Sequence, residues 1–182
     1  MAGRYDLTNE IVESPDYKVT ETALGTWRRY LYPSGADFAE FRSHSEFMGL
    51  PLVHYTRGIC PETGRRITAK GVIAVGRKAV GIIAIGQVSA GLMAFGQACI
   101  GILALGQAAA GFIAVGQAAI AYHFGLGQLA TGRTAIGQLA LGGHVLAQAG
   151  FGRHVWSGSV RDPEAVNHFR ALLKSLLSVF GG

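Results

Sequence analysis

Five consecutive ten-residue repeats occupy residues 71–120: GVIAVGRKAV, GIIAIGQVSA, GLMAFGQACI, GILALGQAAA and GFIAVGQAAI. One extra residue, Ala121, follows, and the pattern resumes as YHFGLGQLAT, GRTAIGQLAL, GGHVLAQAGF and GRHVWSGSVR. Most repeats divide into two pentads that begin with glycine, and the second pentad position alternates between a large apolar residue and glutamine. Such self-similarity indicates a repeat architecture, in which each unit packs on its neighbours.

The repeat length separates a helical from an extended conformation. At about 100° per residue, a ten-residue repeat turns a helix by roughly 280° net, so glycines and glutamines would spiral around it. In an extended chain the side-chain period is two, and an even repeat returns every side chain to the same face. The repeats therefore predict short strands joined at glycine corners.

We predict a β-solenoid in which four pentads close a coil of about 20 residues, with glycine at each corner. The expected fold class is all-β, with an irregular N-terminal segment before the repeats and a C-terminal capping α-helix. The third and fifth pentad positions are predicted to point inward. They are Ile73, Val75, Ile83, Ile85, Met93, Phe95, Leu103, Leu105, Ile113 and Val115, and in the glutamine pentads Val88, Ala90, Ala98, Ile100, Ala108, Ala110, Ala118 and Ile120.

This inward pair within a five-residue unit is similar to the pattern of pentapeptide-repeat proteins, whose quadrilateral coils hold four pentads. The resemblance covers about residues 71–160 and is architectural. Some of those proteins mimic DNA through acidic side chains, which these repeats lack. The chain also resembles uncharacterised bacterial proteins with tandem G-[IV]-[IV]-A-[IV]-G repeats, preceded by a segment like GLPLVH at 49–54 and followed by one like DPEA at 162–165. That resemblance implies the fold and no particular activity.

Outward apolar side chains are the main indication of function. Exposed apolar patches beyond a few hundred Å² mark an interface or a membrane contact. With 20 residues per coil, two strips are expected on opposite sides, which favours lateral association of several copies. The predicted assembly face comprises Ile82 and Ile102 on one side and Leu92 and Phe112 on the other. The predicted glutamine ladders, whose stacked amides reinforce coil pairing, comprise Gln87 and Gln107, and Gln97 and Gln117.

An amphipathic helix is predicted after the repeats. Asp162 at the N-cap and Pro163 at the first helical position are both favoured at a helix start. The apolar residues that recur at helical spacing are Val166, Phe169, Leu173, Leu176 and Leu177. We expect this helix to cover the last coil, and a membrane-surface helix is the alternative.

The chain is expected to have four segments: an N-terminal extension (1–35), irregular first coils (36–70), regular repeats (71–160) and the C-terminal helix (161–182). Charge is uneven along them. No acid occurs between Glu62 and Asp162, residues 79–132 carry no formal charge, and five bases gather at 65–78. We interpret these bases as a solubilising collar, with attraction to anionic lipid or nucleic acid as alternatives.

Enzyme signatures are missing or accidental. The glycines at 71 and 76 are followed by Arg77 and Lys78, whereas a phosphate-binding loop needs lysine and then serine or threonine. His144 and His154, half a coil apart, are expected on opposite walls, and His123 has no acid nearby in the repeats, so neither a general base nor a metal site is predicted. Cys60 and Cys99 lack metal-ligand spacing and are expected to be buried reduced thiols.

The sequence thus predicts a non-enzymatic structural protein, without cofactor or small-molecule substrate, that self-associates as a filament, bundle or homo-oligomer. The alternative is membrane association, through the apolar solenoid face and terminal helix or through transmembrane hairpins in 81–122. Nucleic-acid binding is not expected, because no aromatic residues interleave with the bases at 65–78. The first 14 residues contain no signal-peptide pattern. The expected location is therefore cytoplasmic, with membrane attachment as the variant.

Overall fold

A computed structural model describes residues 18–180 of the chain, with side chains as far as residue 178. Residues 1–17 of the predicted N-terminal extension and residues 181–182 lie outside the described part. The described chain is mostly β-structure with one C-terminal helix, which confirms the expected fold class at that level.

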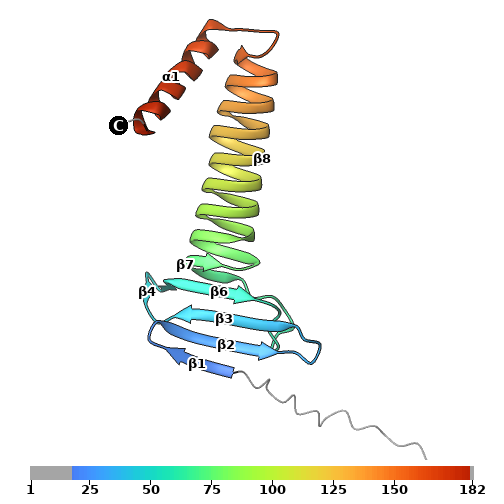
Figure 1. Ribbon diagram of the computed structural model, residues 1–182, viewed down its shortest axis with the longest axis vertical. Coiled ribbons are helices and arrows are strands. Elements are labelled where there is room, and N and C mark those ends of the chain that lie inside the picture. Colours follow the sequence, from blue (N-terminus) through green and yellow to red (C-terminus); the bar gives the residue numbers. More distant parts are fainter. Residues whose placement is uncertain (1–17, 181–182) are drawn as a thin grey trace, which may run out of the picture.

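The N-terminal part is a sheet of short strands. Its strands β1 (Lys18–Thr22), β2 (Gly25–Leu31), β3 (Asp37–Ser43) and β6 (Val53–Arg57) are neighbours in that order and antiparallel, and β6 then pairs in parallel with β7 (Ala69–Val75). The short strands β4 (Glu46–Phe47) and β5 (Leu50–Pro51) form a separate ladder. Figure 1 shows the sheet stacked at one end of a long wound strand.

The segment predicted as irregular first coils contains antiparallel strands instead. Its expected start, after residue 35, falls in the turn between β2 and β3, which pair along their whole lengths. The chain reverses there because Gly35 adopts a positive φ of 80°, and its N–H donates to the carbonyl oxygen of Tyr32. Strands β1, β2, β3 and β6 therefore belong to one sheet, which continues through β7 into the repeats.

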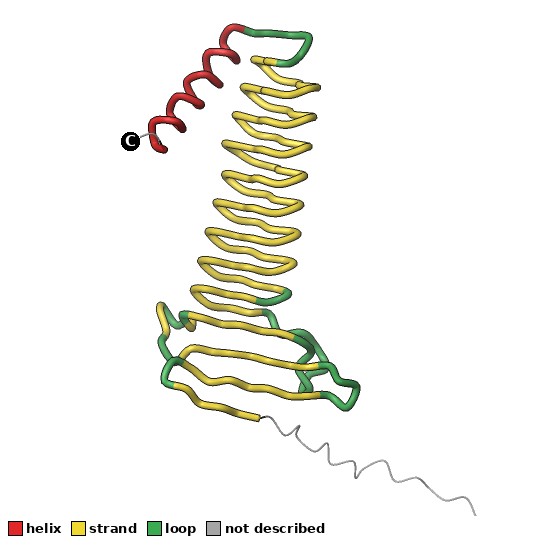
Figure 2. The backbone as a smooth tube through the Cα atoms, viewed as in Figure 1, coloured by secondary structure: helices red, strands yellow, loops and turns green. Residues whose placement is uncertain are grey.

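The repeats form β8 (Lys78–Trp156), a single strand of 79 residues that winds in successive turns about one axis (Figures 1 and 2). Residues of β7 pair with residues ten positions ahead in β8, as in Ala69 with Ala79 and Ile73 with Ile83. The prediction of 20 residues per turn is therefore wrong. Two pentads suffice, because glycine corners without a Cβ allow a sharper reversal than we assumed: a Cβ on Gly91 would collide with the carbonyl oxygen of Gly81 in the preceding turn.

The interior of the winding is lined by the fourth position of each pentad. These side chains, none more than 2% exposed, are Ala74, Ala79, Ala84, Ser89, Ala94, Cys99, Ala104, Ala109, Ala114 and Ala119. The predicted inward positions, three and five, point outward instead; for example, Val88, Ile100 and Ile120 are 53%, 65% and 62% exposed. A ten-residue turn brings its two walls so close that small side chains fill the space between them. Near the last turns, Val145 is the largest fully buried side chain at this position.

The helix α1 (Pro163–Phe180) begins where the sequence predicted. The Oδ1 atom of Asp162 accepts a hydrogen bond from the N–H of Glu164 at 2.8 Å, which confirms the N-cap. The helix folds back beside the winding and does not lie across its end (Figures 1 and 2). The expected cap over the last coil is thus wrong, because Ala165 and Phe169 bury themselves against outward side chains of β8.

The structure also excludes helical hairpins in 81–122, since all of these residues belong to β8. Within the described residues, α1 is the single helix, and it lacks the combination of length and apolarity needed to cross a bilayer.

Candidate functional site

The predicted assembly face lies outward, although its geometry differs from the expectation. Because each turn holds ten residues, the four side chains form one ladder on one wall rather than strips on opposite sides. They are Ile82, Leu92, Ile102 and Phe112, with 37%, 51%, 57% and 45% of their surfaces exposed. Tyr122 continues the ladder, with its ring centroid 5.8 Å from that of Phe112.

Large apolar side chains also cover the rest of the winding. Val80, Ile100 and Ile120 are exposed on the wall formed by the glutamine pentads, and Ile85 and Met93 on the wall of the assembly face. Residues 79–132, here called the apolar belt, contain no Asp, Glu, Lys or Arg. The exposed residues Lys78 and Arg133 bound the belt at its two ends. The belt therefore carries its large apolar side chains on the outside, whereas its interior is lined by small side chains.

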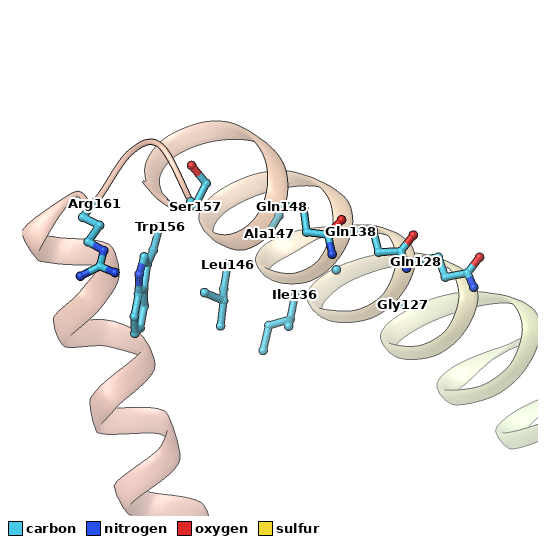
Figure 3. Close-up of a pocket in the computed structure, with 12 residues that line it drawn as sticks. Gly127, Gln128, Ile136, Gln138, Leu146, Ala147, Gln148, Trp156, Ser157 and Arg161 are labelled. Carbon is cyan, nitrogen blue, oxygen red and sulfur yellow. The ribbon is translucent and has the colours of Figure 1, made fainter.

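The glutamines lie along one edge of the winding. The two predicted ladders are one ladder in the structure, because a glutamine recurs after each full turn. The exposed amides are those of Gln87, Gln97, Gln107 and Gln117, continued by Gln128, Gln138 and Gln148. Figure 3 shows the last three on successive turns, beside a groove of about 750 Å³ that Trp156 and Arg161 close on its other side. Hydrogen bonding between the stacked amides stays a prediction.

A histidine cluster lies where α1 meets the last turns of β8. His144 and His154 occupy adjacent turns with ring centroids 5.1 Å apart, so their predicted placement on opposite walls is wrong. His168 of α1 stacks on His144 at 4.1 Å, and its Nε2 atom lies 2.9 Å from the hydroxyl of Thr134. Burial lowers the pKa of His168, and the neighbouring His144 and His123 lower it further.

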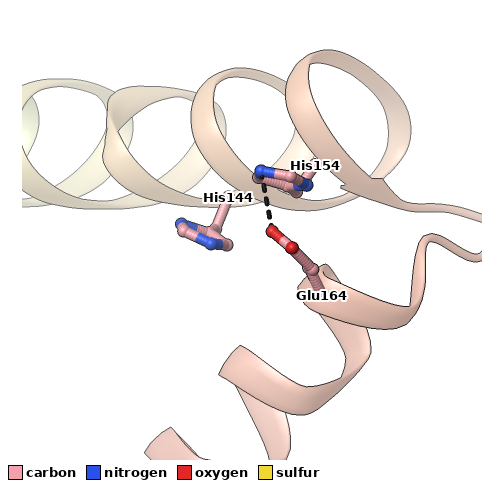
Figure 4. Close-up of side chains that lie close together, drawn as sticks. All are labelled: His144, His154 and Glu164. Carbon is pink, nitrogen blue, oxygen red and sulfur yellow. Dashed lines mark ion pairs between the residues drawn. The ribbon is translucent and has the colours of Figure 1, made fainter.

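Two carboxylates complete this cluster. The Oδ2 atom of Asp162 lies 3.1 Å from Nδ1 of His154, and Oε2 of Glu164 lies 3.0 Å from Nε2 of the same ring. Figure 4 shows Glu164 reaching from the first turn of α1 toward the two stacked rings. The hydrogen bond from the Glu164 N–H is the main cause of the lowered pKa of Asp162. Sequence reasoning missed these acids because it searched inside the repeats, whereas they follow directly after them.

The apolar side chains of α1 make a second contact with the winding. Phe169, Leu172 and Leu173 face Ile136, Leu146 and Trp156 across an apolar cavity of about 260 Å³. Of the predicted helix residues, Phe169 is buried and Val166 partly buried, whereas Leu173, Leu176 and Leu177 are at least 50% exposed. The helix therefore packs near its start and leaves much of its apolar face uncovered.

A second polar cluster ties the N-terminal sheet to the first turn. Glu40 accepts hydrogen bonds from Arg28 and from Nε2 of His54, and the Nδ1 atom of His54 accepts from the N–H of Lys70 at 2.9 Å. The hydrogen bond from His54 is the largest cause that lowers the pKa of Glu40, and the Arg28 charge adds to it. These residues come from four different strands, so no spacing in the sequence reveals them. The burial of the Glu40 and His54 side chains and their mutual pairing indicate a structural role.

The two cysteines, Cys60 and Cys99, are buried thiols, as predicted. Comparison of the chain with protein-family models, curated proteins and solved structures finds no match. The interpretation of function therefore depends on the geometry of the winding and of its two ends.

Proposed function

We propose that residues 69–156 form a β-solenoid with ten residues per turn, and that this solenoid is a non-enzymatic structural element whose apolar belt lies in a lipid bilayer. One observation carries the proposal: the large apolar side chains of the belt point outward, and alanine, serine and cysteine fill the interior. In water, the hydrophobic effect favours the opposite arrangement. An apolar medium around the belt removes that conflict.

The height of the belt supports a bilayer as that medium. Its 54 charge-free residues (79–132) make about five turns of ten residues. Neighbouring strands lie ~4.8 Å apart, so five turns rise by roughly 25 Å, close to the hydrocarbon thickness of about 30 Å. The bases at Arg77, Lys78 and Arg133 then lie where lipid headgroups begin.

The hydrogen bonding of the backbone is compatible with lipid. A spanning segment must satisfy its own N–H and C=O groups, because hydrocarbon offers no partners. Every residue of the belt lies in the continuous strand β8, and the turns of this strand serve as each other's neighbouring strands. At the lower edge of the belt, Ala79 pairs with Ala69 of β7. Both ends of the winding lie beyond the belt: at one end β7 pairs with β6 of the N-terminal sheet, and at the other the strand ends at Trp156. The remaining outward polar groups are the glutamines and, near one end of the belt, Tyr122 and His123. Neighbouring amides one turn apart can bond to each other along the axis.

Self-association is the second candidate, and a specific observation favours it. An exposed apolar strip runs along one wall and consists of Ile82, Leu92, Ile102 and Phe112. The exposed glutamine amides of one copy can both donate hydrogen bonds to and accept them from the same amides of a second copy. Two copies could bury these strips against each other in a symmetric contact. Repetition of the contact would give a homo-oligomer, bundle or filament with a scaffold role.

Flotation of the full chain with lipid vesicles tests the first proposal against the second. The wild-type chain should float with the vesicles and resist extraction at alkaline pH, since the belt would be inserted rather than adsorbed. Ile102→Lys, in the belt, should reduce insertion by at least tenfold, because a lysine at the bilayer centre costs about 2.5–3.5 kcal/mol. Phe151→Lys, equally outward but beyond the belt, is the matched control and should insert normally. A chain that stays with the water-soluble fraction as a defined oligomer would reject the bilayer and support self-association.

A further inference from the structure

We propose that His144, His154 and Glu164 bind a divalent transition-metal ion of the zinc class, and that this ion clamps the start of α1 to the last turns of the winding. Within the described residues, these three are the one group of at least three His, Cys, Asp or Glu side chains with a metal-compatible geometry. The site lies beyond the apolar belt and does not depend on what surrounds the belt.

The donor atoms are already gathered. One ligand atom from each side chain lies within 4.8 Å of the other two, and the closest pair, Nε2 of His154 and Oε2 of Glu164, is 3.0 Å apart. Tetrahedral zinc with bonds of about 2.0–2.1 Å holds its donors roughly 3.3 Å from each other. Glu164 has an exposed side chain, so the carboxylate is able to adjust to an ion without disturbing packing (Figure 4).

The backbone fixes the two imidazoles. His144 and His154 are ten residues apart on adjacent turns of β8, which places their rings side by side with an interplanar angle of 24°. His168 also stacks on His144, at 4.1 Å, and is itself held by Thr134, so it orients that ring without being a ligand. Two ligands on a rigid strand and a third on a helix make a site that forms only when α1 is docked.

Asp162 supplies the outer contact that metal-binding histidines require. Its Oδ2 atom lies 3.1 Å from Nδ1 of His154. A proton on Nδ1 donated to this carboxylate leaves the lone pair of Nε2 directed at Glu164, where the ion would lie. The chemistry of two imidazoles and one carboxylate suits zinc, cobalt or nickel, whereas magnesium and calcium prefer oxygen ligands alone.

Titration of the chelator-treated full chain with cobalt(II) tests the site. The expected result is one equivalent of bound ion with visible absorption bands, displaced by zinc. Glu164→Gln and His144→Ala should each weaken binding by at least tenfold, and His123→Ala, at a second pentad position in the repeat that follows Ala121, should not change it. The metal-free variants should still unfold in one cooperative transition, which shows that they fold. Absence of binding to the wild-type chain, or unchanged binding in Glu164→Gln and His144→Ala, would overturn the assignment.

Hydrogen exchange of α1 tests the clamp itself. Zinc should slow amide exchange in residues 163–178 of the wild-type chain and leave it unchanged in Glu164→Gln. Stoichiometric binding without any slowing of exchange would overturn the clamping role.

Discussion

Gly101 packs so closely on the preceding turn that a Cβ atom at this position would lie 2.5 Å from the carbonyl oxygen of Gly91. The two residues are ten positions apart, and the same contact recurs between successive glycines along β8. The stacking of the turns therefore requires glycine at the corners, and a substitution at this contact tests the ten-residue turn directly.

Gly101→Ala should destabilise the winding, because the new methyl group meets a backbone oxygen that has no room to move. Overpacking of this kind costs about 1–3 kcal/mol. Gly158→Ala is the matched control, since nothing lies within 4 Å of its added Cβ. Thermal unfolding followed by circular dichroism should show a lower transition temperature for Gly101→Ala alone. Equal transitions for the two variants would argue against the stacking.

The assignment of faces predicts opposite outcomes for two alanines in the same turn. Ala104 is fully buried between the walls, whereas Ala108 is exposed. Ala104→Leu should cost about 3 kcal/mol or prevent folding, because the interior has no space for three more carbon atoms. Ala108→Leu should be tolerated. The free energy of unfolding of each variant, measured by denaturant titration, would contradict our assignment if the order were reversed.

The ten-residue period and the glycine corners allowed the strand to be predicted from the sequence. Hydrophobicity, however, led to the wrong assignment of the side chains that point inward. We expected large side chains inside, as in a wide coil. The better signal was restriction in size: the fourth position holds only Ala, Ser or Cys through residue 119, whereas the third and fifth positions range from alanine to phenylalanine. A position that rejects every large residue faces a narrow interior. The recurrence of glutamine every ten residues likewise indicated the turn length.

The histidine cluster was hidden by the same error. With ten residues per turn, His144 and His154 necessarily lie on adjacent turns of one wall. The reversal of the chain after residue 156, which brings Asp162 and Glu164 back to them, is a tertiary feature that no spacing in the repeats encodes.

The stability of the N-terminal sheet should depend on pH through Glu40. Its pKa is lowered in the folded chain, so the stabilisation is complete above the unfolded-state pKa of about 4.3 and is lost as pH falls through the lower folded-state pKa. Glu40→Gln should remove about 1.5–3 kcal/mol at neutral pH and flatten the acid dependence. Glu21→Gln on the exposed strand β1 is the control. Urea unfolding followed by Trp27 fluorescence, in a chain with Trp156→Phe, measures both. Parallel pH profiles for wild type and Glu40→Gln would refute this role.

Docking of α1 should depend on Phe169 and hardly on Leu177. Phe169 is 6% exposed against the winding and Leu177 is 63% exposed. Phe169→Ala should cost about 3 kcal/mol of docking, visible as faster hydrogen exchange in residues 163–178. Leu177→Ala should leave this exchange near the wild-type rate. Similar exchange in both variants would mean that the observed packing does not hold the helix.

The most direct test of the central proposal is the accessibility of spin labels on the belt in vesicles. Single cysteines replace Ile102 on one wall and Ala98 on the other, with Lys78 and Arg133 as flanking controls; the buried Cys60 and Cys99 set the labelling background. We predict that labels at 98 and 102 collide often with oxygen and rarely with a water-soluble nickel chelate, and that labels at 78 and 133 do the reverse. Frequent chelate collisions at 98 and 102, or poor access of both reagents to them, would contradict a lipid-embedded belt.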